Sequence, residues 1–152
     1  ERGDTEDARA AVEALESLRS SLRAGLDADA GVMVPTLRAA VAREEGRLAE
    51  ALERARTAAE RAERQPVPYG PPSTYKPPRE LEGEILLAME RPQAAMAAFR
   101  QGLERTPRRP ASLLGMARAA RAAGEAERAA TAYARLEAVW ERAEEGWPGL
   151  DE

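Results

Sequence analysis

The chain has 152 residues, of which 33% are charged and 43% hydrophobic, a composition typical of one globular domain of ordinary size. It contains no Cys and no His, which excludes disulfides, thiolate nucleophiles, imidazole bases and the usual zinc sites of Cys and His. Alanine supplies 34 residues while β-branched and aromatic residues are scarce, which predicts an all-α fold. The net charge of −4 argues against binding of nucleic-acid phosphates as the main function.

The chain shows no pattern typical of a membrane-spanning segment. No window approaches the about 20 consecutive apolar residues that a membrane helix needs, so we expect a soluble protein. The sequence begins with Glu1 rather than Met, and we expect that a preceding segment was removed or belongs to a longer protein. Because that segment could include a signal peptide, the compartment stays open.

The first part of the chain predicts three helices from the spacing of its apolar residues. One apolar stripe runs from about residue 4 to about residue 25, with spacings of three and four that are typical of one helix face. Gly25 to Gly31 predicts a break, after which helices are expected from Val34 to Gly46 and from Leu48 to about Arg64. The stripe of the first helix consists of Ala8, Val12, Leu15, Leu18 and Leu22.

A proline-rich connector follows these helices. Six of the 14 residues from Gln65 to Pro78 are proline, which excludes regular helix and predicts extended backbone. Tyr69, Tyr75 and Lys76 in this segment are the least generic feature of the sequence. Two interpretations stay open: a packed connector whose tyrosines cover apolar helix surface, or a loop that caps or narrows a binding groove.

The second half predicts two helix pairs with short turns. Apolar spacing of three and four continues before and after the turn at Glu90-Arg91-Pro92, where Pro92 suits the first turn of a helix. The same spacing continues before and after Gly124-Glu125 and ends near Trp140. Together with the first part, these elements predict seven helices.

A repeat of 34 residues relates the last two pairs. Ala95 and Ala129 lie 34 residues apart, as do Phe99 and Tyr133, and 34 is the tetratricopeptide period. Small residues occur where that family has them, at Ala39, Gly83, Ala117, Ala51, Ala95 and Ala129. The chain therefore resembles the tetratricopeptide repeat family, and its sequence from Gly70 to Phe99 is similar to the last repeats of longer bacterial members. The large residues usual at the fourth and eleventh places are mostly missing, so the repeats are degenerate.

The resemblance implies an α-solenoid of stacked antiparallel helix pairs, because one pair cannot bury its apolar face alone. In this division the N-terminal helix is the second helix of a truncated repeat, and an apolar strip on it is expected to face an upstream repeat or another chain. The predicted units are 1–31 (half repeat and loop), 32–64 (helix pair), 65–78 (connector), 79–109 (helix pair), 110–145 (helix pair) and 146–152 (tail).

The resemblance also implies a binding groove along the first helix of each pair. The family's ligand-facing places, carried over to this chain, nominate Arg43, Glu80, Glu84, Leu87, Leu114, Arg118 and Arg121, together with Met33, Thr36, Ala40, Pro77 and Ala111. An extended peptide with acidic and basic groups, or a partner helix, could match this mixed charge. The alternative is that these are ordinary solvated helix faces. The family's clamp for C-terminal carboxylates uses Asn, which this chain lacks, so we do not expect that activity.

Neither catalysis nor nucleic-acid binding is favoured by the remaining charged residues. Glu80 and Glu84 lie one turn apart, as acid/base carboxylates or cation ligands might be arranged in an enzyme, but helices carry such pairs routinely and no His or nucleophile motif accompanies them. Arg105, Arg108 and Arg109 cluster around Pro107 without interleaved aromatic residues, which favours a solvated loop. We therefore expect no catalytic residues, no metal and no cofactor.

The sequence predicts a non-catalytic module that binds a peptide or partner protein on the concave face of a tetratricopeptide-like solenoid. An alternative is a structural or assembly subunit that permanently buries its surfaces against other chains. An enzyme that uses Glu and Arg side chains is the weakest alternative. The resemblance implies a bacterial protein of the cytoplasm or periplasm.

Overall fold

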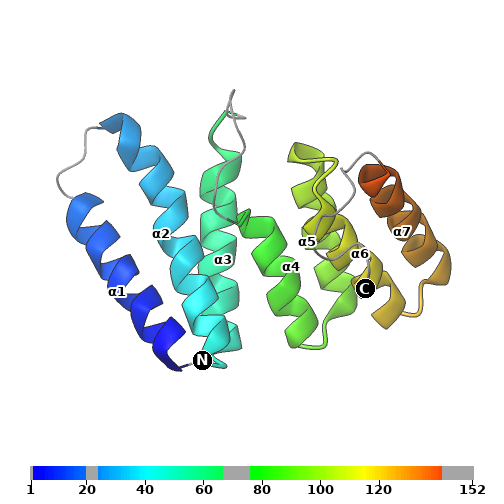
Figure 1. The fold of residues 1–152 in the computed structure, drawn as a ribbon, viewed down its shortest axis with the longest axis horizontal. Coiled ribbons are helices and arrows are strands. Elements are labelled where there is room, and N and C mark those ends of the chain that lie inside the picture. The colour runs from blue at the N-terminus through cyan, green and yellow to red at the C-terminus, as the bar shows by residue number, and fades with distance from the viewer. Residues whose placement is uncertain (1, 20–23, 67–75, 142–152) are drawn as a thin grey trace.

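The computed structural model describes residues 2–19, 24–66 and 76–141, and within these ranges all regular secondary structure is α-helix (Figure 1). This confirms the predicted all-α fold and the seven helices. None of the described helices is long and apolar enough to cross a membrane. The helices are α1 (Arg2–Arg19), α2 (Ala24–Glu44), α3 (Leu48–Glu63), α4 (Pro78–Ala88), α5 (Pro92–Arg105), α6 (Pro110–Ala122) and α7 (Ala126–Trp140).

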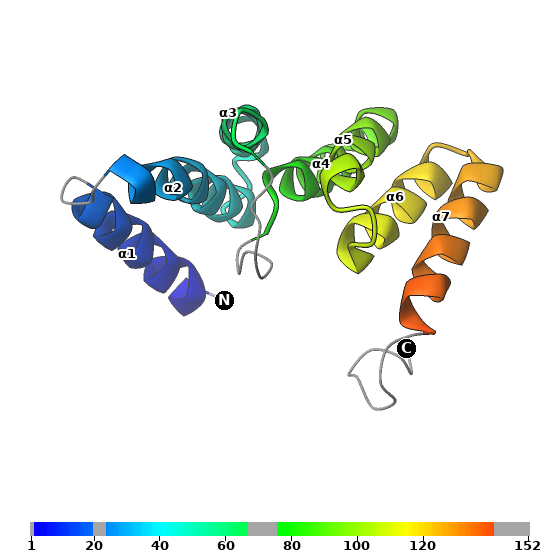
Figure 2. The ribbon, with the colours of Figure 1, turned by 90° about the horizontal axis from the view of Figure 1, so that it is seen from above.

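Each helix packs against its neighbours in sequence order, which produces a row of helices. In addition, α2 contacts α4 and α4 contacts α6, whereas α3 and α5, and likewise α5 and α7, do not contact each other in the described chain. Figure 2 shows α3 and α5 along the upper side of the row, with α2 and α6 below them. The even-numbered helices from α2 to α6 therefore approach one another more closely than the odd-numbered helices from α3 to α7.

Three equivalent turns join α2 to α3, α4 to α5 and α6 to α7. In each turn one residue has a positive φ, and the next backbone N–H donates a hydrogen bond of 2.8 to 2.9 Å to a carbonyl five residues earlier. This is the Schellman arrangement, which satisfies free carbonyls at a helix end. Because the second and third of these residues lie 34 positions apart, the turns follow the predicted alignment. The positive-φ residues are Gly46, Glu90 and Gly124.

The predicted break from Gly25 to Gly31 is wrong, because α2 continues through it and contains Pro35. Proline has no N–H to donate to the carbonyl four residues earlier, so Pro35 leaves the Gly31 carbonyl without its helical partner. Arg61 of α3 donates from Nη1 to that carbonyl at 3.1 Å. A neighbouring helix thus satisfies the group that proline frees, and α2 continues over 21 residues.

The first helix ends at Arg19, earlier than the predicted residue near 25. It packs against α2 through buried Val12 and through ion pairs of Arg9 with Glu45 and of Glu16 with Arg38. Most side chains of its predicted apolar stripe lie outside the described residues, so an upstream repeat or another chain on this helix stays a prediction.

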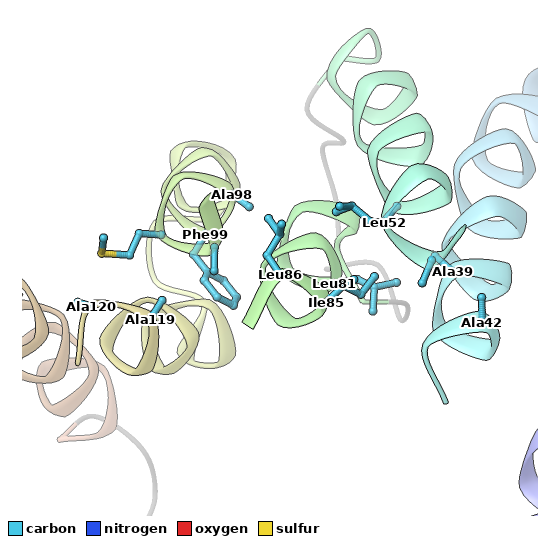
Figure 3. Close-up of a cluster of buried hydrophobic side chains, with 14 of the residues drawn as sticks. Ala39, Ala42, Leu52, Leu81, Ile85, Leu86, Ala98, Phe99, Ala119 and Ala120 are labelled. Carbon is cyan, nitrogen blue, oxygen red and sulfur yellow. The ribbon is translucent and has the colours of Figure 1, made fainter. Parts of the chain in front are cut away.

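The main hydrophobic core is built from small side chains around one large ring. Phe99 of α5 is fully buried, and Figure 3 shows its ring between the ribbons of α4 and α6. A Cβ added at Gly83 of α4 would lie 2.6 Å from Cζ of Phe99, and one at Gly115 of α6 would lie closer still. Real Cβ atoms do not approach a ring so closely, so the ring occupies space that only two glycines leave open. Three helices therefore meet at Phe99.

Tyr133 does not reach the same depth as Phe99, although it lies 34 residues later in α7. Positions one repeat period apart are expected to be buried alike, but Tyr133 is only half-buried. Phe99 is covered by α6 of the following helix pair. No further helix pair follows α7 within the described residues to cover Tyr133 in the same way.

We predict that Gly115→Ala lowers the free energy of unfolding by up to about 2 kcal/mol. Overpacking costs about 1–3 kcal/mol and outweighs the better helix propensity of alanine, which is worth about 1 kcal/mol. Gly31→Ala is the matched control, because a Cβ at Gly31 of α2 meets nothing within 4 Å, and it should stabilise the chain. Urea unfolding measures both changes. If Gly115→Ala is as stabilising as Gly31→Ala, the ring does not require the glycine.

Candidate functional site

The charged side chains of α4 organise the predicted groove. Glutamates occupy every second position from Glu80 to Glu84, so successive carboxylates leave the helix in different directions. Each of the three bonds to a different neighbouring helix. Glu80 bonds to the start of α6, Glu82 to α3 and Glu84 to α2. We therefore describe the site one glutamate at a time.

Glu80 is buried, with 1% of its surface exposed. The prediction that it lines an open groove is therefore wrong. Its Oε2 accepts hydrogen bonds of 2.6 Å from Nε of Arg109 and 2.6 Å from Oγ of Ser112, and its Oε1 accepts one of 3.1 Å from Nη2 of Arg109. Arg109 is the residue before α6 and Ser112 lies in the first turn of that helix. Glu80 thus fixes the start of α6 to α4.

Glu82 is also buried and belongs to a network that joins α3 to α4. It accepts a hydrogen bond of 2.9 Å from Nε of Arg56 and one of 2.7 Å from Nη1 of Arg79. Arg79 also donates hydrogen bonds to both carboxylate oxygens of Glu63, at 2.7 and 3.0 Å. These bonds hold the pKa of the Glu63 carboxyl below its ordinary value and raise the pKa of Arg79, mainly through Glu63 and then through Glu82. The network stabilises the junction between two helix pairs.

Glu84 brings together three of the predicted site residues. Its carboxylate accepts hydrogen bonds of 2.6 and 2.7 Å from Nζ of Lys76, and it forms an ion pair with Arg43 of α2. All three side chains are partly exposed. Arg43 also pairs with the neighbouring Glu44. The charges in this cluster are therefore largely compensated within the chain.

Two leucines of the predicted groove pack against hydrophobic clusters of the interior. Leu87 is half-buried and packs against the main core, and Leu114 is half-buried against a smaller cluster that contains Leu113. Thr36, nominated with them, is buried and donates its hydroxyl to the Val32 carbonyl at 2.7 Å. Thr36 and Glu80 therefore both belong to the protein interior.

Arg118 and Arg121 of α6 differ from the other described arginines of the even-numbered helices. Arg38, Arg43 and Arg79 each form an ion pair with a carboxylate. Arg118 and Arg121 are exposed, and their guanidinium groups have no hydrogen-bond or ion-pair partner among the described residues. They are the uncompensated charges of the predicted groove.

We call the surface part of the predicted groove the even-helix face. It comprises the nominated groove residues that remain exposed or half-buried, together with Lys76 of the connector, which bonds to Glu84. These residues are Met33, Ala40, Arg43, Lys76, Pro77, Glu84, Leu87, Ala111, Leu114, Arg118 and Arg121. Of the proline-rich connector, Tyr69 and Tyr75 lie outside the described residues, so their predicted packing or groove-narrowing role stays a prediction.

The arrangement offers binding groups rather than free acids or bases. Glu80 and Glu82, the two buried carboxylates among the described residues, each bond to arginine, and they bond to different helices instead of facing each other. Within the described ranges, no group of three or more His, Cys, Asp or Glu side chains is placed to hold a metal ion. What remains at the surface is a paired charge cluster at Glu84, two half-buried leucines and two unpaired arginines.

Comparisons with known proteins identify no relative: no protein-family model matches the chain, and no curated protein matches it. The resemblance to tetratricopeptide repeats therefore depends on the period, the small residues and the equivalent turns.

Sequence reasoning missed the partners of the buried glutamates. Arg109 and Ser112 lie 29 and 32 residues after Glu80, so no local pattern connects them. Helix geometry places Glu80 and Glu84 one turn apart on the same face and sets only Glu82 apart from them. The sequence therefore held no local signal that would separate buried Glu80 from partly exposed Glu84.

We predict that Glu80→Gln lowers the free energy of unfolding by about 1–3 kcal/mol, because it weakens charge-assisted hydrogen bonds to a buried group. Glu84→Gln makes the same chemical change at a half-exposed ion pair and should cost less than about 1 kcal/mol. Urea unfolding of both variants provides the comparison. Equal losses would show that Glu80 is no more structural than Glu84.

Proposed function

We propose that the chain is a non-catalytic protein-interaction module of tetratricopeptide type that binds a peptide or partner protein on the even-helix face. Three helix pairs with equivalent turns support the proposal, as do the contacts of α4 with α2 and α6, which bring the first helices of the pairs together. Repeats stacked in this way offer a continuous surface to an extended ligand.

The single observation that carries the proposal is the pair of unpaired arginines on α6. Leu114, Arg118 and Arg121 follow one another at spacings of four and three, so they share one side of the helix. A half-buried leucine beside two exposed cations suits a ligand with an apolar side chain next to carboxylates. Because the even-helix face compensates its other charges internally, the acidic part of the ligand is assigned to this end.

The cluster of Arg43, Lys76 and Glu84 has a lesser role in this proposal. A ligand must compete with ion pairs that already exist there, so the cluster contributes little affinity. It can still discriminate between ligands by opposing an unmatched charge.

A structural or assembly subunit is a second candidate, favoured by the open edge of α6. Leu114 lies 34 residues after Glu80, and Arg121 lies 34 residues after Leu87. Glu80 bonds to the following even-numbered helix, whereas no such helix follows α6 in the described chain. The same leucine and arginines could therefore meet another chain permanently. An enzyme has the weakest support, because the buried carboxylates are held by arginine.

We predict that the double variant Arg118→Glu, Arg121→Glu binds selected peptides at least about tenfold more weakly, which corresponds to about 1.4 kcal/mol. The probes are peptides selected on the wild-type chain from a random phage-displayed library and then synthesised. The free energy of unfolding should change by less than about 0.5 kcal/mol, because both arginines are exposed and unpaired.

The double variant Arg91→Glu, Arg108→Glu is the control, since the side chains of these arginines are also exposed and without a partner among the described residues but lie in turns outside the even-helix face. It changes the net charge equally and should bind the peptides as the wild type does. The assignment is contradicted if the Arg118→Glu, Arg121→Glu variant binds the peptides as tightly as the wild type, or if both double variants lose affinity equally. Light scattering separates the second candidate, which requires stable association with another chain.

A further inference from the structure

A surface hollow lies between α5 and α7 and shares no lining residue with the even-helix face. Its volume is about 420 Å³. α5 contributes residues from Gln93 to Arg100 and α7 contributes residues from Arg128 to Arg135, in both cases at spacings of three and four. Because α5 and α7 do not contact each other, the space between these two stripes is open.

The floor of the hollow is apolar and adaptable. Met96 and Ala97 come from α5, Met116 from α6 and Ala132 from α7. Met96 and Ala132 are buried, whereas Met116 and Ala97 are half-buried. Methionine side chains are flexible and fill irregular space, so such a floor can accept apolar side chains of different shapes.

The rim of the hollow is cationic. Arg100 is exposed and has no partner among the described residues. Arg135 donates to the Pro107 carbonyl at 3.2 Å, which leaves its charge uncompensated, and only Arg128 pairs with a carboxylate, that of Glu125. The residues that line the hollow therefore include three arginines and one glutamate, although the chain as a whole carries a net charge of −4.

The hollow next to α1 differs from the α5–α7 hollow in how its arginines are paired. That other hollow has a volume of about 350 Å³ and is lined by Arg9, Arg38, Arg47 and Arg54. Each of these four arginines forms an ion pair with a glutamate. Its charges are satisfied within the chain, whereas those at the α5–α7 hollow are available to a ligand.

We infer that the α5–α7 hollow is a docking site for an acidic amphipathic helix of a partner protein. Apolar side chains from successive turns of that helix enter the floor at Met96 and Met116. Carboxylates on its flanks meet Arg100, Arg128 and Arg135, which selects acidic over basic helices and accelerates encounter. The inference adds a site formed by different residues, mainly of α5 and α7, and does not depend on the proposed function of the even-helix face.

A pair of model peptides tests the inference by fluorescence anisotropy on the full chain. Each peptide has about 18 residues, or five helical turns, with leucines along one face. One carries glutamates on both flanks and the other carries lysines at the same places. The glutamate peptide should bind the wild type, more weakly at higher salt, and the lysine peptide should bind at least about tenfold more weakly.

Variants of the chain locate the binding. Arg100→Glu with Arg128→Glu should weaken the glutamate peptide at least about tenfold, and Thr131→Trp should abolish its binding by filling the mouth of the hollow. Arg118→Glu with Arg121→Glu is the matched control and should leave this binding unchanged.

Three outcomes would overturn the inference. The first is equal affinity for the two peptides, and the second is binding that survives both the charge reversal and Thr131→Trp. The third is self-association of the chain that Thr131→Trp abolishes, which would assign the hollow to a second copy.

Discussion

The ring of Phe99 sets how closely α4 and α6 approach, because it occupies the space that Gly83 and Gly115 leave open. Glycine within a helix costs about 1 kcal/mol relative to alanine, and burial of a large ring offsets that cost. The ring also belongs to α5, so one side chain determines the relative position of three helices. The rest of the core consists largely of alanine and a few leucines, which allow close helix packing but supply little shape of their own.

Two carboxylates of α4 fix its position relative to the neighbouring helices, in addition to the ring of Phe99. Glu80 fastens α4 to the start of α6, and Glu82 fastens it to α3 through Arg56. With α4 held on both sides, two groups of arginines toward the end of the row have no carboxylate partner among the described residues: Arg118 and Arg121 on α6, and Arg100 and Arg135 at the hollow between α5 and α7. Each proposed binding site therefore contains arginines whose charge the described chain does not compensate.

Local patterns predicted the helices and their turns, because apolar spacing and turn residues are local properties. They failed where a distant residue changes the outcome. Within α2 the Gly31 carbonyl that Pro35 frees is satisfied by Arg61 of α3, and the buried carboxylate of Glu80 is satisfied by Arg109 and Ser112. The contact of Arg43 with Glu84 was compatible with the predicted groove, but the sequence did not show that the two charges neutralise each other. Charges without a partner become visible only when every neighbour is known.

Hydrogen exchange of the wild-type chain under native conditions, measured amide by amide, tests most directly whether α4, α5 and α6 form one unit around Phe99. Amides in contact with a shared core exchange only when the whole unit opens, whereas helices at the ends open locally. We expect the central amides of α4, α5 and α6 to share the highest opening free energy, and those of α1 and α7 to exchange faster. Separate opening free energies for α4 and α6, or protection of α7 equal to theirs, would contradict the account.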